Sequence, residues 1–350
     1  METSTGSPVI QTFDLGTPWR TFDPFLFCVH HNDAYPAGDG SLAPAASLAG
    51  RQIGADFSGL DGWSMYHGDS VPGFPQHPHR GFETVTFVRL GYIDHADSLR
   101  AKARYGAGDT QWLTAGAGIV HAEMFPLLRD DAANPAELFQ IWLNLPREDK
   151  MAEPFFAMLW SEDTPSFEAI DGGGRGAIVT VVAGAIGNYV PPKPPPSSWA
   201  ARADTDVAIW RVALESNATW TIPAANPGTV RTLYVFDDGD LIVGAQMIPK
   251  GSGGVVDASV GVRVAAGPDG STFLVLQGRP IGEPVAQYGP FVMNDQAGLD
   301  QAFSDYRRTG FGGWPWADDA PTHGHVSARF VQRPDGTLEL PPGADPSLVG

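Results

Sequence analysis

The sequence predicts an all-β fold built from sandwiches or barrels, and three observations support this. Glycine and proline are abundant, at 42 and 31 of 350 residues, whereas charged residues make up only 18%. The apolar runs are short, and Gly, Pro and Asp separate them. The runs are also rich in Val, Ile, Phe, Trp and Thr, which favours strands over helices. We therefore expect many turns and few long surface helices.

Six apolar runs have the length and composition of strands. They cover residues 84–90, 139–145, 177–182, 207–214, 232–236 and 272–276. Turn signals lie between them: residues 106–109 (GAGD) precede a strand, and Asp238-Gly239 is a candidate β-hairpin. Many short strands at this spacing are typical of sandwiches and barrels.

One helix is expected, at residues 295–308. Leu299, Phe303 and Tyr306 recur there at helical spacing, and Gly310 follows as a stop signal. Residues 189–200 (YVPPKPPPSSWA) hold too much proline for a central strand, so we expect a polyproline-like surface insertion; an interaction motif is the alternative. From Trp316 onward we expect an irregular tail.

The charge and cysteine content exclude several classes of protein. A net charge of −18 disfavours direct binding to nucleic acid but allows a basic protein partner. Cys28 is the only cysteine, which excludes an internal disulfide and fits a reducing compartment. The start METSTGSPVI does not resemble a signal peptide, and no run of about 18 apolar residues predicts a membrane span. We expect a cytoplasmic protein.

The histidines are concentrated in the first part of the chain. None of the nine lies between His121 and His323, so a histidine-based metal site is expected only in the first half. Length allows two β domains, which we place at residues 1–160 and 161–295, with 296–350 as helix and tail.

Two strand segments carry metal-binding residue types at the spacing of one strand face. Residues i and i+2 of a strand point to the same side, so His77 projects with His79, and His121 with Glu123. A lone histidine on an apolar strand is more often a core or surface residue, but two such pairs favour a metal site. Three imidazoles and one carboxylate suit a divalent transition metal. Four ligands would leave about two octahedral positions open, which indicates catalysis or ligand binding.

Glu83 leaves an alternative open. It has the parity of His79, so it could replace Glu123 as a ligand or orient an imidazole from outside the metal's ligand set.

Four stretches of the sequence resemble the pirin family of the cupin superfamily. They are HPHRGFETVTF, GDTQWLTAGAGIVHAEM, LFQIWLNLP and PVAQYGPFVMN. The resemblance implies a bicupin of two stacked β-barrels, with a metal in the N-terminal barrel (1–160) and none in the C-terminal barrel (161–295). It implies that His77, His79, His121 and Glu123 are the ligands. Iron(II) is the expected ion, and nickel, copper, cobalt and manganese are alternatives.

The resemblance also implies an activity, because family members are similar to flavonol dioxygenases of the quercetin 2,3-dioxygenase type. The substrates would be a flavonoid such as quercetin and O2. Glu123 would accept the proton of the flavonol 3-hydroxyl as general base, and cleavage of the ring would release carbon monoxide. The alternative is a non-enzymatic co-regulator that binds a protein partner and uses its iron as a redox switch.

Strand parity suggests the walls of such a site. Counting from His79 places Val85 and Phe87 on the inner face, and counting from Glu123 places Ile119 and Phe125 there. Each of these residues is also an ordinary core candidate. Gln140 lies in an apolar strand and needs a hydrogen-bond partner if buried, so we expect it to approach the metal. The predicted substrate-binding residues are Phe87, Phe125 and Gln140.

Four other motifs are interpreted as structural. Residues 116–121 (GAGIVH) lack the third glycine of a dinucleotide fingerprint and are expected to be a turn into a strand. Cys28 is expected to be a buried thiol beside surface histidines at positions 30 and 31. His95 is expected in a polar hairpin end. The second H-x-H pair, His323 and His325, has no partner pair and is expected in the tail.

Overall fold

The computed structural model describes residues 7–348 of the chain. Residues 1–6 lie outside the described residues, so the expectation that the chain starts without a signal peptide is not addressed there. Within the described part, no helix is long and apolar enough to span a bilayer.

Two compact units make up the chain. One combines Val29–Glu162 with Glu283–Gly350 and contains all nine histidines, so we call it the histidine unit. The other combines Met1–Cys28 with Asp163–Gly282, and we call it the second unit. Residues up to Cys28 thus group with the second unit, and the helix and tail group with the histidine unit. The domain limits expected from the sequence stay a prediction.

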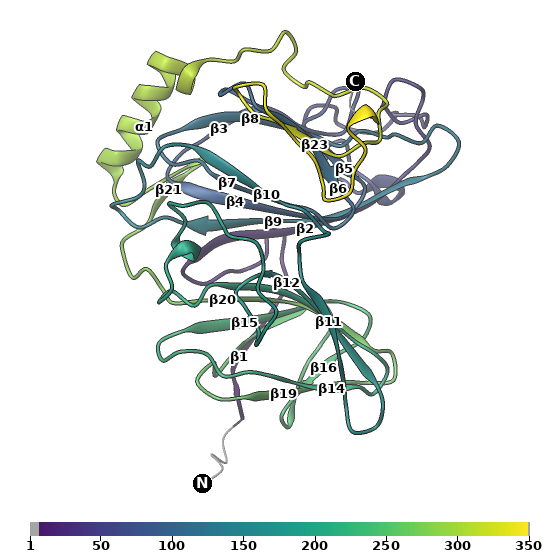
Figure 1. The fold of residues 1–350 in the computed structure, drawn as a ribbon, viewed down its shortest axis with the longest axis vertical. Coiled ribbons are helices and arrows are strands. Elements are labelled where there is room, and N and C mark those ends of the chain that lie inside the picture. The colour runs from purple at the N-terminus through teal and green to yellow at the C-terminus, as the bar shows by residue number, and fades with distance from the viewer. Residues whose placement is uncertain (1–6, 349–350) are drawn as a thin grey trace. The chain divides into compact units, whose positions relative to one another are not determined.

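Two antiparallel-paired sheets form the histidine unit (Figure 1). The five-stranded sheet has the order β10 (Phe155–Leu159), β7 (Thr110–Thr114), β4 (Phe82–Leu90), β9 (Asn134–Asn144) and β2 (Phe25–Tyr35). The six-stranded sheet has the order β24 (Leu338–Glu339), β23 (Phe330–Gln332), β6 (Lys102–Gly106), β5 (Tyr92–Asp97), β8 (Ile119–Met124) and β3 (Gly73–His79). A separate ladder joins β21 (Ala286–Tyr288) to β22 (Phe291–Met293).

The second unit also consists of two sheets. Its seven-stranded sheet has the order β1 (Val9–Asp14), β18 (Ser252–Val256), β15 (Val230–Asp237), β20 (Ser271–Gly278), β13 (Ala208–Leu214), β12 (Gly176–Ala183) and β11 (Ser166–Ile170). Its four-stranded sheet has the order β14 (Thr219–Ile222), β19 (Val262–Ala266), β16 (Leu241–Val243) and β17 (Gln246–Ile248). The all-β prediction is therefore confirmed.

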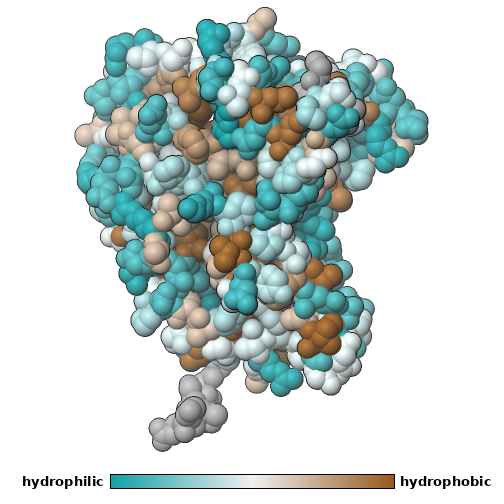
Figure 2. Space-filling view, viewed as in Figure 1, coloured by the Kyte–Doolittle hydropathy of each residue, from teal (hydrophilic) through white to brown (hydrophobic). Residues whose placement is uncertain are grey.

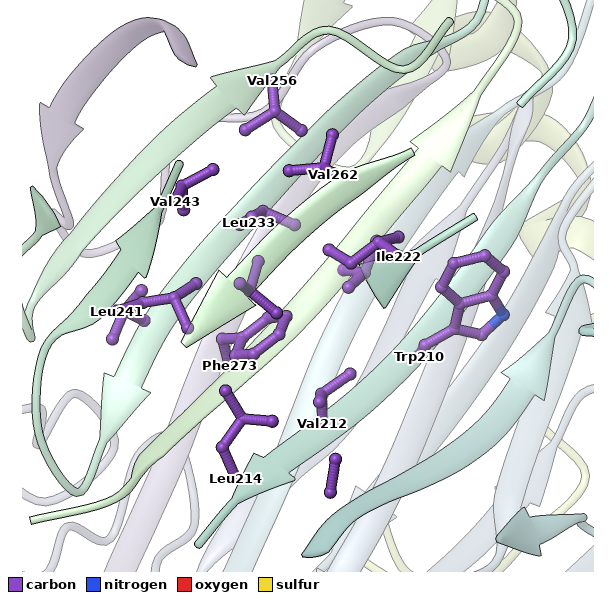
Figure 3. Packing of buried hydrophobic residues seen from close by; sticks show 14 of the residues in the cluster. Trp210, Val212, Leu214, Ile222, Leu233, Leu241, Val243, Val256, Val262 and Phe273 are labelled. Atoms are coloured by element: carbon purple, nitrogen blue, oxygen red, sulfur yellow. The ribbon is translucent and has the colours of Figure 1, made fainter. Parts of the chain in front are cut away.

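Alternation along the strands builds the core of the second unit. Trp210, Val212 and Leu214 project from one face of β13 into a cluster with Leu233 and Phe273 (Figure 3). The residues between them in β13 face away from this cluster, as the period of two requires. We call the face that carries this cluster the inner face of the seven-stranded sheet.

Between residues 7 and 348 the structure has one α-helix, α1 (Gln296–Thr309), which agrees with the helix expected at 295–308. The Asp295 carboxylate accepts a hydrogen bond from the Gly298 backbone N–H at 2.9 Å and caps the first turn. Gly310 ends the helix in the left-handed conformation, with φ of 54°. Leu299 and Ala302 bury the apolar face of the helix.

Two expectations about connections are wrong. The turn at Asp238 does not close a hairpin, because β15 pairs with β18 and β20, whereas β16 belongs to the other sheet. The tail is not wholly irregular, because β23 pairs antiparallel with β6 and extends the six-stranded sheet. Neither pairing is visible in local sequence, since both join segments far apart in the chain.

The surface is mainly hydrophilic on the face shown, with small separate hydrophobic patches (Figure 2).

Candidate metal centre

Strands β3 and β8 bring the two sequence pairs together. They pair antiparallel, with His77 opposite His121 and Phe74 opposite Glu123. A register shift between Phe74 and His77 marks a bulge just before the first histidine. Alternation within each strand then places His79 on the same side as His77, and Glu123 on the same side as His121.

The three imidazoles of this pairing converge. One ring nitrogen each of His77, His79 and His121 lies within 4.8 Å of the other two. The ring centroids of His77 and His121 are 4.5 Å apart, and those of His79 and His121 are 4.9 Å apart. His79 and His121 are buried, and His77 is partly buried. We call these three residues the histidine triad.

The triad is neutral and offers free lone pairs. Burial lowers the pKa of His77 to about 4 and moves the pKa values of His79 and His121 well below the usual 6.5. The Nδ1–H of His77 donates to the Pro75 carbonyl at 2.8 Å, which leaves its Nε2 as the unprotonated nitrogen. Among the described residues, His79 Nδ1 and both His121 nitrogens have no hydrogen-bond partner. Buried nitrogens without partners are costly unless a ligand satisfies them, so these residues fit a metal ion.

Glu123 lies beside the triad, and three side chains hold its carboxylate. Its Oε1 accepts hydrogen bonds from Thr86 Oγ1 at 3.1 Å and Tyr105 Oη at 3.4 Å. Its Oε2 accepts from Gln140 Nε2 at 2.9 Å and lies 3.8 Å from His121 Nε2. Burial raises the pKa of this carboxyl group above its ordinary value of 4.5. Gln140 is therefore connected to the triad by its hydrogen bond to Glu123. That Glu123 itself binds the metal stays a prediction.

Glu83 and Phe87 are on the opposite side of β4 from Glu123. Thr86 of the same strand contacts Glu123, so the residues that alternate with it face away. Glu83 accepts a hydrogen bond from Thr114 Oγ1 at 2.6 Å, and Phe87 stacks on Phe139. The parity argument that placed Phe87 on the inner face with His79 is wrong. A turn at residues 80–81 separates β3 from β4, so a count from His79 does not continue into β4.

Aromatic side chains surround the triad. Phe82 and Trp142 lie edge-on to His79, with ring centroids 5.1 and 5.5 Å away. Phe74 lies 6.3 Å from His77 and 6.0 Å from Phe125. Phe125 thus takes part in this aromatic wall through Phe74.

His95 was missed from the sequence. It is fully buried in β5, opposite Glu123 in the β5–β8 register, and its ring centroid is 5.5 Å from that of His121. Its Nε2 lies 3.1 Å from Asp97 Oδ2. The expected polar hairpin end is therefore wrong. The alternation of Ile93, His95 and Asp97 was the available signal, because it marks one face of a strand.

The remaining histidines have other partners. His31 is buried, which corrects its expected surface position, and its Nδ1 lies 2.8 Å from Tyr66 Oη. His323 Nε2 contacts the His95 carbonyl and His325 Nε2 contacts the Gly40 carbonyl, so the second H-x-H pair does not converge. Cys28 is buried as expected, and burial raises the pKa of its thiol.

Comparison with known proteins gives consistent matches. Residues 16–143 match the Pirin family model, and residues 209–312 match the Pirin C-terminal cupin domain. A "Pirin-like protein" of Caulobacter vibrioides is 34% identical over 317 residues, covering 88% of this chain and 95% of the relative. A "Putative quercetin 2,3-dioxygenase" of Pseudomonas aeruginosa is 33% identical over 239 residues, covering 68% of this chain and 79% of the relative.

One solved structure supports the fold. The crystal structure of quercetin 2,3-dioxygenase from Acinetobacter baumannii superposes with a TM-score of 0.68 at 23% identity, covering 87% of this chain and 98% of that one. At this identity the likeness establishes the architecture alone.

Proposed function

The chain belongs to the pirin family of bicupin proteins, and on this premise we propose that it is a metal-dependent dioxygenase that cleaves a flavonol such as quercetin with O2. Relatives about one third identical carry the name of this activity in putative form. The observation that supports it most is the neutral histidine triad, in which His79 and His121 are buried, with Glu123 beside it.

In this proposal His77, His79 and His121 hold one divalent ion, with Glu123 as the fourth ligand. Iron(II) is the ion we propose, although nickel, copper, cobalt and manganese accept the same ligands. When bound, such an ion supplies a positive charge that favours the deprotonated 3-hydroxyl of the flavonol.

Glu123 would accept the 3-hydroxyl proton at Oε2. Gln140 Nε2 of β9 holds the carboxylate at Oε2, and the Thr86 hydroxyl of β4 lies between Glu123 Oε1 and Gln140 Oε1, at 3.1 and 2.8 Å. Phe82 and Trp142 would exclude water and offer flat surfaces to an aromatic substrate. Phe125 contributes to the aromatic wall because its ring contacts that of Phe74. Phe87 stacks on Phe139 on the opposite face of β4, so it could contact a substrate only from that face.

An iron-dependent co-regulator is the second candidate. The net charge of −18 favours a basic protein partner, and curated relatives named pirin are also about one third identical. A regulator would need the same triad but no turnover of a flavonol.

Turnover separates the two candidates. We expect the iron-loaded protein to consume quercetin aerobically, with loss of its visible absorbance and release of carbon monoxide above the rate of free iron. Glu123→Gln should lower kcat/KM about 100-fold or more, because a positioned general base contributes about 10²–10⁴-fold. Glu168→Gln, at an exposed position in the second unit, is the matched control and should keep full activity. A wild-type rate no higher than that of free iron would reject the enzyme and favour the regulator.

A further inference from the structure

A cavity lies at one end of the core of the second unit. Its volume is about 340 Å³, at the lower end of the range of small-molecule pockets. The inner face of the seven-stranded sheet lines it with Trp210 of β13, Arg231 of β15 and Gln277 of β20. Arg231 and Gln277 are direct partners in the β15–β20 register, so their side chains lie next to each other. The unit holds no histidine, so this cavity is independent of the triad.

Arg231 is fully buried and incompletely paired. It follows the parity of Leu233 in β15, so it points to the inner face beside the core. Its Nε donates to Gln277 Oε1 at 2.7 Å, and one terminal nitrogen donates to the Pro223 carbonyl at 2.9 Å. The other terminal nitrogen, NH1, is buried and has no partner among the described residues. A buried cationic nitrogen without an acceptor is costly, which indicates that an acceptor from outside the chain belongs there.

The carboxylate in the cavity wall, Asp206, opposes the effect of burial on the pKa of Arg231 through its charge, but its Oδ2 is hydrogen-bonded elsewhere. Asp206 Oδ2 accepts hydrogen bonds from the Asn226 backbone N–H at 2.7 Å and Thr229 Oγ1 at 3.0 Å. The Gln277 amide donates to the Asp206 backbone carbonyl at 3.0 Å, which fixes the Gln277 oxygen toward Arg231. Burial lowers the pKa of Arg231 to about 10, so the guanidinium stays charged at neutral pH.

Trp210 supplies a flat apolar part of the cavity wall, which also carries the polar residues Arg202, Thr205 and Asp206. Trp210 donates its indole N–H to the Gly184 carbonyl at 2.7 Å, so only its apolar surface is left for a ligand. The centroid of its ring lies 6.0 Å from the Arg231 guanidinium carbon. Trp210 stands at the end of the core row that Val212 and Leu214 continue (Figure 3). A ligand that reaches Arg231 would therefore have a flat apolar body beside its charged group.

We propose that this cavity binds a small aromatic carboxylate, with the carboxylate on Arg231 NH1 and the ring against Trp210. The site discriminates by charge, because a carboxylate adds electrostatic attraction to the guanidinium, which the carbonyl oxygen of a neutral amide of the same shape lacks. A charge-assisted hydrogen bond of this kind corresponds to about 10- to 100-fold in affinity.

Fluorine NMR of the full-length protein, with para-fluorobenzoate and para-fluorobenzamide as probes, tests this proposal. Para-fluorobenzoate should bind saturably and at least about tenfold more tightly than the amide. Arg231→Met should abolish this preference. Its circular dichroism spectrum checks that it folds, because the Gln277 Oε1 and the Pro223 carbonyl lose their donor. Arg263→Met, at an exposed arginine of β19 in the same unit, is the matched control and should bind as the wild type does.

A second pair of variants keeps the test decisive if Arg231→Met does not fold. Ala203 is exposed and lines the cavity, so changes there should spare the fold. Ala203→Glu should weaken para-fluorobenzoate binding several-fold by repulsion, whereas Ala203→Gln should not. Absence of saturable benzoate binding in the wild type, or equal binding by the Glu and Gln variants, would overturn the proposal.

Discussion

Asp33, Tyr66 and His31 form a buried chain of hydrogen bonds in the histidine unit. Tyr66 Oη donates to Asp33 Oδ2 at 2.7 Å, and since this uses its one proton, His31 Nδ1–H must donate to the Tyr66 oxygen at 2.8 Å. Burial raises the pKa of the Asp33 carboxyl group from 3.8 to about 6. It lowers the pKa of the His31 imidazole to about 4. Asp33 and His31, which both contact the Tyr66 hydroxyl, are thus each shifted toward the neutral form.

The shift at Asp33 predicts a pH dependence of stability. Between pH 4 and 6 the folded chain retains a proton at Asp33 that the unfolded chain has released, so this group destabilises the fold as pH rises. Asp33→Asn removes the effect, and relative to the wild type the variant should gain about 3 kcal/mol of unfolding free energy over this window. His31 is present in both chains, so its opposite contribution cancels in the difference. Urea unfolding of both proteins at a series of pH values measures this difference in unfolding free energy. A difference that does not change with pH would contradict the raised pKa of Asp33.

The turn between β3 and β4 shows which parts of the site the sequence could predict. Within β3 and within β8 alternation is local, so the facing of His77 with His79 and of His121 with Glu123 followed from spacing alone. The alternation of side chains between the two faces of a strand does not continue through the turn at Gly81. A count that starts at His79 therefore assigned Phe87 to the wrong face of β4. Pairings between distant segments, such as β5 with β8 and β23 with β6, were also beyond local pattern. Local alternation could have marked His95 as a strand residue, but its place beside His121 depends on the β5–β8 pairing.

Gly81 gives a prediction for this turn. It has φ of +85°, and a Cβ there would collide with the Val292 carbonyl oxygen. Gly59 is also left-handed, at +61°, but a Cβ there would meet nothing within 4 Å. Ala at either position should cost about 1–2 kcal/mol for the backbone conformation. Gly81→Ala should cost about 1–3 kcal/mol more than Gly59→Ala because of the clash. Denaturant unfolding of both variants measures the difference, and equal losses would show that the turn relaxes freely.

At the scale of the whole molecule, the two units share an all-β architecture but differ in chemistry. All nine histidines and the triad lie in the histidine unit, whereas the second unit buries an arginine beside an apolar cavity. Composition and the absence of histidine from residues 122–322 predicted this inequality from the sequence. The Arg231 cavity was not predictable, because its lining comes from strands and loops spread over residues 184–277.

Metal content tests the histidine triad most directly, since the proposed activity and the alternative switch both need a bound ion there. His121→Ala is the sharpest variant, because neither His121 nitrogen has a hydrogen bond to lose among the described residues. After anaerobic loading with ferrous iron and removal of free metal, the wild type and the exposed control His325→Ala should each hold about one ion per chain by elemental analysis. His121→Ala should hold almost none while keeping its circular dichroism spectrum. A wild type without bound metal, or a His121→Ala variant that retains it, would show that the triad does not hold the ion.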